Sequence, residues 1–125
     1  MEHLNTAIRQ LTDKGVRRLE HLELLLVLSR PPLRDWGAGE VADSLSLPFT
    51  SIQEALTHLH GHKLVLAVDP TRARYRIADR PELAMLAEIR AAHERDRVHV
   101  MNLFYACNLD SLRSFADAFR LRRKP

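Results

Sequence analysis

The sequence has a single cysteine, Cys107, among its 125 residues. An intramolecular disulfide is therefore excluded, which is typical of proteins from a reducing compartment. The sequence contains only four glycines, and they form no glycine-rich phosphate loop and no Gly-x-Ser-x-Gly elbow. A His-Glu-x-x-His motif is also missing. Because the carboxylates are scattered rather than paired, we expect that the chain is not an enzyme and carries no cofactor.

Long apolar runs are missing as well. The longest runs, Leu24–Leu28 and Leu64–Val68, are far shorter than the roughly 18–20 residues that cross a bilayer. The first residues lack the succession of charged, apolar and small residues that marks a secretory signal peptide. The sequence therefore predicts a cytoplasmic protein that does not span a membrane.

The composition is that of one folded domain. Apolar residues make up 46% of the chain and charged residues 28%, well away from the composition of disordered chains. A chain of 125 residues can bury one core but is short for two ordinary domains. The net charge of +3 is small, so a polyanion would have to be bound by a local basic surface.

Apolar residues recur at helical spacing through the first half of the chain. The predicted helices cover about 3–13, 16–29, 38–45 and 49–61. Arg30-Pro31-Pro32 cannot continue a helix and favours a short extended piece from Leu33 to Trp36. In the last of these helices one side is apolar and faces the core, while the opposite side is polar. The apolar stripe consists of Ile52, Ala55, Leu56 and Leu59.

A β-hairpin is predicted next. The apolar run Leu64–Val68 ends at the turn signal Asp69-Pro70, and Tyr75-Arg76-Ile77 alternates apolar and charged residues. The tip of this hairpin holds Arg72 and Arg74.

Helical spacing returns after Pro81, which fits the first position of a helix. The sequence leaves open whether one long helix or two follow. A break is predicted at 108–110, with Asp110 as the N-cap of a last helix. Four basic residues, Arg120, Arg122, Arg123 and Lys124, lie at the end of that helix.

The order of helix, short helix, tight turn, longer helix and hairpin is that of a winged helix-turn-helix. The segment Gly39–Leu59, GEVADSLSLPFTSIQEALTHL, resembles the turn and recognition helix of bacterial winged-helix regulators of the MarR and ArsR kind. The resemblance covers about residues 17–78. It implies a mostly α fold with a small β-hairpin, in which residues 1–80 form a DNA-binding domain and 81–125 a C-terminal helical extension of the same globule.

The resemblance implies sequence-specific binding of double-stranded DNA and regulation of transcription. The helix of residues 49–60 would enter the major groove, and the hairpin of residues 64–77 would lie on the backbone or in the minor groove. In the groove, Gln53 could pair with adenine and Glu54 could accept from cytosine N4. The candidate residues on the helix are Thr50, Ser51, Gln53, Glu54, Thr57 and His58. The candidate phosphate contacts are Lys63, Arg72, Arg74 and Arg76.

Two of these roles have alternatives. Ser51 with Glu54, and Thr50 with Gln53, fit capping-box patterns that would tie the side chains to the backbone. The triplet His58, His60 and His62 could hold a metal ion, since residues i and i+4 share a helix side. No neighbouring carboxylate or thiol in the sequence completes that set. A second loose cluster consists of His93, His99 and Cys107, and we predict no metal site at either place.

The helices after Pro81 exceed a minimal winged helix. We expect them to form a homodimer, because two-fold pairing places two recognition helices one DNA turn apart. The alternative is that they fold back onto the first helices of the same chain. A second functional hypothesis is a winged-helix module that binds a transcription or sensor protein instead of DNA, which the acidic Glu54 on the recognition side favours.

Overall fold

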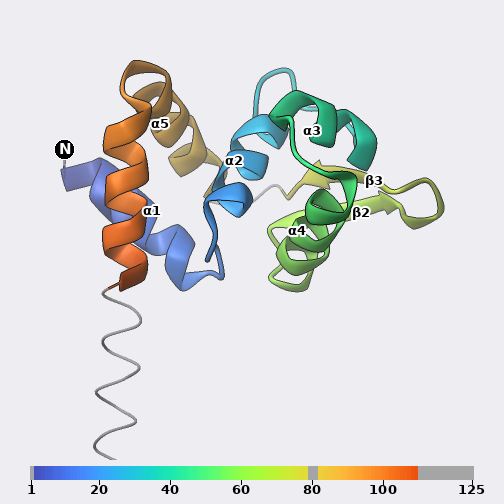
Figure 1. Cartoon of the computed structure of the whole chain (residues 1–125), viewed down its shortest axis with the longest axis horizontal. Coiled ribbons are helices and arrows are strands. Elements are labelled where there is room, and N and C mark those ends of the chain that lie inside the picture. Colours follow the sequence, from blue (N-terminus) through green and yellow to red (C-terminus); the bar gives the residue numbers. More distant parts are fainter. Residues whose placement is uncertain (1, 79–81, 110–125) are drawn as a thin grey trace, which may run out of the picture.

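Helices dominate the structure, a computed structural model that describes residues 2–78 and 82–109 (Figure 1). The helices are α1 (Glu2–Asp13), α2 (Leu19–Leu28), α3 (Ala38–Leu45), α4 (Phe49–Gly61) and α5 (Glu82–Arg95), followed by the helical residues 97–109. The strands are β1 (Trp36–Gly37), β2 (Val65–Asp69) and β3 (Arg74–Ile77), and the 3₁₀ turn η1 (Pro70–Arg72) joins β2 to β3. The prediction of a mostly helical fold that contains a β-hairpin is confirmed.

Helix α2 lies at the centre of the core. From His21 to its last residue, Leu28, every side chain except that of Glu23 is buried. A helix that is apolar on nearly all sides must be covered on nearly all sides, and α2 contacts α3, α4 and α5. It begins at Leu19, three residues later than the predicted start at Val16. The turn before it passes through Gly15, whose φ of 111° ends the preceding helical path.

The turn between α3 and α4 agrees closely with the sequence prediction, since both helices have the predicted bounds. Ser46 ends α3 in the left-handed conformation with φ of 55°. Its backbone N–H donates to the carbonyls of Ala42 and Asp43, and the N–H of Leu47 donates to the carbonyl of Ala42. These bonds satisfy carbonyl groups that the end of a helix leaves open.

The sheet has one strand more than the predicted hairpin. Its strand order is β1-β3-β2, and β1 pairs with β3 through Trp36 opposite Tyr75 and Gly37 opposite Arg74. The predicted extended piece from Leu33 to Trp36 therefore leads into a short edge strand. Because side chains alternate along a strand, Tyr75 lies on one face of the sheet, and Arg74 and Arg76 lie on the other.

The C-terminal helices pack on α1 and α2. Helix α5 contacts both, and Leu86, Ile89, Val100 and Phe104 are part of the hydrophobic core. Residues 82–109 form two helices, not one, because the helical path is interrupted at Asp96. The side chain of Asp96 accepts a hydrogen bond from the backbone N–H of His99 at 3.1 Å and so caps the start of the second helix.

Two further contacts attach that second helix to the first half of the chain. Arg97 forms an ion pair with Glu23 of α2, and the Cys107 thiol donates to the side-chain oxygen of Asn5 in α1. Asn108 and Leu109 are helical, so no break begins at Asn108 as predicted. The predictions for Pro81, for the N-cap at Asp110 and for the final basic run lie outside the described residues. Within those residues, no helix has the length and apolar character needed to cross a membrane.

Candidate nucleic-acid interface

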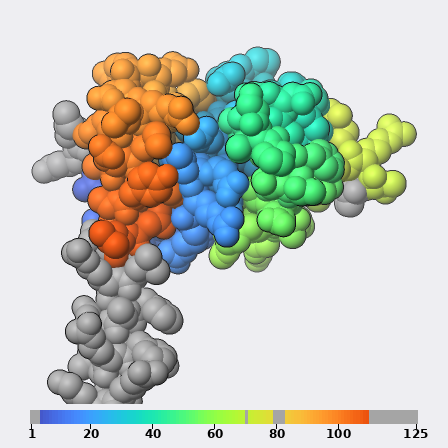
Figure 2. Space-filling model, in the orientation of Figure 1, coloured from blue at the N-terminus to red at the C-terminus, as the bar shows by residue number. Residues whose placement is uncertain are grey.

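Helix α4 has one buried and one exposed side, as its sequence pattern predicts. Ile52, Ala55, Leu56 and Leu59 are at most 2% exposed. The opposite side carries exposed polar side chains from Thr50, Gln53, Glu54 and Thr57, with Ser51 and His58 half-buried at its edge. The described part of the C-terminal region does not cover this side: the helical residues 97–109 lie beyond α2 from α3 and α4 (Figure 2).

The polar side chains of α4 are not used to cap the helix. Its N-cap is Pro48, and no side chain bonds to the first turn. The two predicted capping boxes are therefore not formed. The Thr57 hydroxyl donates to the backbone carbonyl of Gln53 at 2.9 Å. Across residues 2–78 and 82–109, no hydrogen bond or ion pair engages the side chain of Gln53 or Glu54. Both side chains can therefore meet a ligand without breaking a protein contact.

The exposed side of α4 lies between two hollows. One, of about 360 Å³, separates it from the start of α2 and is lined by Arg17, Arg18, Glu20, His21, Ser51, Glu54, Ala55 and His58. The other, of about 610 Å³, separates it from β3 and is lined by Thr50, Gln53, Glu54, Thr57, His58 and Tyr75. Glu54 and His58 line both hollows. The site is thus a polar ridge with a groove on each side.

Arg17 and Arg18 are site residues that the sequence analysis did not identify. Both are exposed and line the hollow beside α4. Arg18 forms an ion pair with Glu20 at 3.3 Å, whereas no ion pair of Arg17 is found in the described part of the chain. A sequence signal existed: the two arginines directly precede an apolar helix. Without the fold, nothing related that helix end to α4.

Three imidazole rings hold the loop that carries these arginines against α4. The rings of His21 and His58 stack with centroids 4.4 Å apart, and those of His58 and His62 lie 4.6 Å apart. The Nε2–H of His58 donates to the carbonyl oxygen of Gly15 at 2.6 Å. The Nδ1 atom of His21 accepts from the backbone N–H groups of Arg17 and Arg18. The loop is therefore fixed at three points.

His21 is held in its neutral form. The ring is only 6% exposed, and its Nδ1 atom must stay unprotonated to accept the two amide hydrogens. Burial, followed by the nearby charges of His58 and Arg18, lowers the pKa of His21 from 6.5 to about 4. The loop that carries Arg17 and Arg18 therefore packs in this way only while His21 is unprotonated.

This coupling predicts a loss of stability in mild acid. Between pH 6.5 and about 4 the unfolded chain binds a proton at His21 that the folded chain does not, so the free energy of unfolding falls as the pH falls through that window and levels off below it. We expect a loss of about 1–2 kcal/mol, since solvent partly screens the site.

Urea denaturation of the wild type and of His21→Gln at pH 7.5, 5.5 and 4.5 measures this loss. Glutamine keeps a hydrogen-bond acceptor but cannot take up the proton, so its stability should depend less on pH. Equal pH dependence of the two proteins would contradict the role given to His21.

Among the described residues, the rings of His21, His58 and His60 do not converge as metal ligands would. His21 and His58 stack face to face, with an interplanar angle of 11°, and do not converge on a common point. His60 Nδ1–H donates to the carbonyl of Val65, so its ring lies toward β2. In the parts of the chain that are described, no group of three or more histidine, cysteine, aspartate or glutamate side chains could hold a metal ion.

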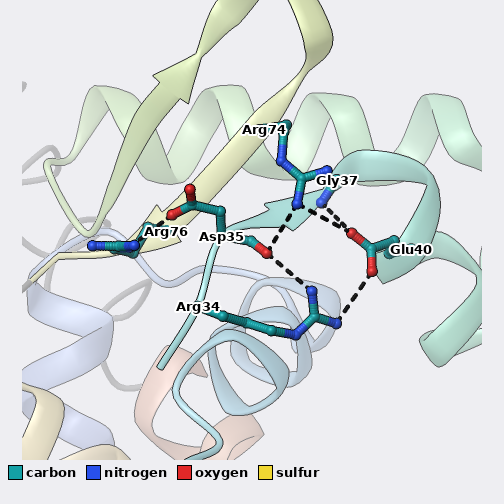
Figure 3. Close-up of polar contacts among 6 residues, drawn as sticks. All are labelled: Arg34, Asp35, Gly37, Glu40, Arg74 and Arg76. Atoms are coloured by element: carbon teal, nitrogen blue, oxygen red, sulfur yellow. Dashed lines mark hydrogen bonds and ion pairs between the residues drawn. The ribbon is translucent and has the colours of Figure 1, made fainter. Parts of the chain in front are cut away.

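The predicted arginines of the hairpin separate into two groups. Arg72 lies at the tip, with 80% of its side chain exposed and Asp69 at 3.8 Å. Arg74 and Arg76 instead join an ion-pair network at the other face of the sheet (Figure 3). Arg76 contacts the carboxylate of Asp35 at 2.7 Å, and Arg74 contacts that of Glu40 at 3.7 Å. The structure thus does not bring Arg74 and Arg76 together with the exposed side of α4.

The network continues to the start of α3. The carboxylate of Glu40 accepts from the Gly37 amide at 2.9 Å and from Arg34 at 3.2 Å, and these two bonds hold the pKa of Glu40 below its usual value. The guanidinium of Arg34 also lies 3.7 Å above the ring of Trp36. These contacts attach β1 to β3 and α3. The last predicted residue, Lys63, is exposed and follows α4 with φ of 64°.

Comparison of the chain with protein-family models, with curated proteins and with solved structures finds no match.

Proposed function

We propose that the chain is a winged helix-turn-helix protein that binds double-stranded DNA and regulates transcription. Helix α4 enters the major groove, and the hairpin of β2 and β3 is the wing. The element order supports this proposal: α3, a tight turn and α4 are followed directly by an antiparallel hairpin that projects from the body of the molecule (Figure 1).

One observation carries the proposal. The polar side of α4 is open to solvent, and its Gln53 and Glu54 side chains are engaged neither by a helix cap nor by another residue of the described chain. A helix of 13 residues fits the major groove, and side chains that reach base edges must be free to exchange water for the base. In the unbound protein, water satisfies the hydrogen-bonding groups of these side chains.

Backbone contacts come from both sides of that helix. Arg17 and Arg18 lie across one hollow, and Arg72 lies at the tip of the wing. Arg74 and Arg76 are set aside because of their position, since their guanidinium groups lie against Asp35 and Glu40 at the other face of the sheet. Neutralising phosphates releases counterions, so binding must weaken as the salt concentration rises.

The experiment replaces the two arginines at the start of α2. We expect Arg17→Ala combined with Arg18→Ala to weaken binding to random-sequence duplex DNA about tenfold and to make the slope of log K against log salt shallower by about 2. Fluorescence anisotropy at 50–200 mM salt measures both. The matched control is Arg95→Ala, an exposed arginine in the last turn of α5, which should leave both unchanged.

A separate titration, with a duplex just long enough for one two-fold site, tests the assembly. We propose that two copies bind a two-fold symmetric site, with the outer side of the helical residues 97–109 between them. That side exposes Val98, Tyr105 and Leu109 at intervals of seven and four residues. Two chains bound per duplex, counted in the titration, is the expected result. If the wild type shows no salt-dependent binding, the DNA proposal fails and a protein partner for α4 becomes the better hypothesis.

A further inference from the structure

We propose that α4 reads a cytosine, through the carboxylate of Glu54 and the exocyclic amino group of that base. This inference rests on the proposed function, because it names the base that the same helix selects. It starts from the position of Glu54, which lies in the first half of α4 and is the one carboxylate that lines both hollows. The first half of a recognition helix is the part that reaches base edges.

No described residue neutralises the carboxylate of Glu54. Arg17 and Arg18 line the same hollow, yet no ion pair or hydrogen bond joins Glu54 to either within the described residues. Arg18 pairs with Glu20 instead. The predicted capping box with Ser51 is also absent, because Pro48 is the N-cap of the helix. A bare negative charge therefore lies in the middle of a surface that faces a polyanion.

The negative charge of Glu54 is repelled by the phosphates of any DNA sequence. Only a base that donates a hydrogen bond to the carboxylate can offset this repulsion. A carboxylate only accepts hydrogen bonds, so it requires a donor at the base edge. In the major groove, guanine presents the acceptors N7 and O6, and thymine presents the acceptor O4 and a methyl group. Adenine has an amino donor but places the N7 acceptor beside it. Cytosine alone presents an amino donor without an adjacent acceptor, and it is the base that carboxylates read.

The specificity therefore comes mainly from rejection of the other bases. The repulsion between Glu54 and the phosphates lowers the affinity for all duplexes, and the hydrogen bond from cytosine N4 restores it at one position only. Gln53, next to Glu54 and equally free, has no charge and does not impose the same penalty.

The test is selection of bound sequences from a randomised duplex library by the wild-type protein and by two variants. Glu54→Gln removes the charge and keeps the shape of the side chain. Glu88→Gln is the matched control, since Glu88 is an exposed carboxylate of α5 that lines neither hollow. We expect the wild type and Glu88→Gln to select the same motif, with one cytosine preferred at least about tenfold over the other bases.

Glu54→Gln should lose that preference at one position, keep the rest of the motif, and bind random duplexes more tightly than the wild type. A cytosine preference that survives Glu54→Gln, or a wild-type motif without cytosine, overturns this inference and leaves the proposed function standing. If the wild type selects no sequence and binds no duplex, the proposed function fails and this inference fails with it.

Discussion

Replacement of Phe104 by alanine is expected to lower the free energy of unfolding by about 3–5 kcal/mol, the usual cost of removing a buried aromatic side chain. Phe104 is 1% exposed and belongs to the same hydrophobic core as α2 and α4. It lies in the helical residues 97–109, which also contact α1 through Cys107 and α2 through Arg97. The ring therefore joins the C-terminal helices to the half of the chain that carries the candidate interface.

Urea denaturation followed by circular dichroism measures this loss. The matched control is Asn102→Ala, an exposed position of the same helical segment, which should change the free energy of unfolding by about 0.5 kcal/mol or less. A cost below about 1 kcal/mol for Phe104→Ala, or a second unfolding transition, would mean that residues 97–109 are not part of one cooperative core. In that case residues 1–80 could fold alone.

Gly15→Ala is expected to destabilise the protein by about 1–3 kcal/mol and to weaken the proposed DNA binding at the same time. Gly15 has φ of 111°, where side chains other than hydrogen are strained. An added Cβ would also lie 2.5–2.7 Å from three ring atoms of His62. Removing either the backbone strain or the clash with His62 requires the loop that carries Arg17 and Arg18 to move. The two arginines would then no longer lie beside α4.

Three further proteins separate the strain from the clash. His62→Ala alone gives the cost of losing the ring, and Gly15→Ala with His62→Ala removes the clash but keeps the strained φ. We expect the double variant to lose less stability than the sum of the single ones. Gly61→Ala is the control, since a Cβ there meets nothing within 4 Å, and alanine in a helix should stabilise by about 0.5 kcal/mol. Additive losses would contradict the contact between Gly15 and His62.

Much of the fold could be predicted from the sequence because its local signals agree with one another. The spacing of Ile52, Ala55, Leu56 and Leu59 fixed the buried side of α4, and the prolines after Arg30 ended α2 close to the predicted place. Such patterns depend on neighbours within a few residues. The same reasoning failed for the capping boxes, because the choice of N-cap depends on where the first turn begins, and Pro48 took that position.

The candidate site was less predictable because it joins distant parts of the chain. His58 contacts Gly15 across 43 positions of sequence, and Arg76 contacts Asp35 across 41. A single sequence carries no signal for such pairs. The arginines of the hairpin therefore looked equivalent, although Arg76 lies in β3 against an acidic partner, whereas Arg72 is exposed in the turn before that strand. Arg17 and Arg18 were missed for the same reason.

His58 has two duties at once, since it lines the candidate interface and also fastens the loop through Gly15 and His21. A change at this position would alter recognition and folding together. Among the described residues, no hydrogen bond or ion pair joins Thr50, Gln53 or Thr57 to that loop, so they can vary without such a penalty. Among relatives of this chain, position 58 should therefore vary less than positions 50, 53 and 57, whatever ligand the exposed side of α4 binds.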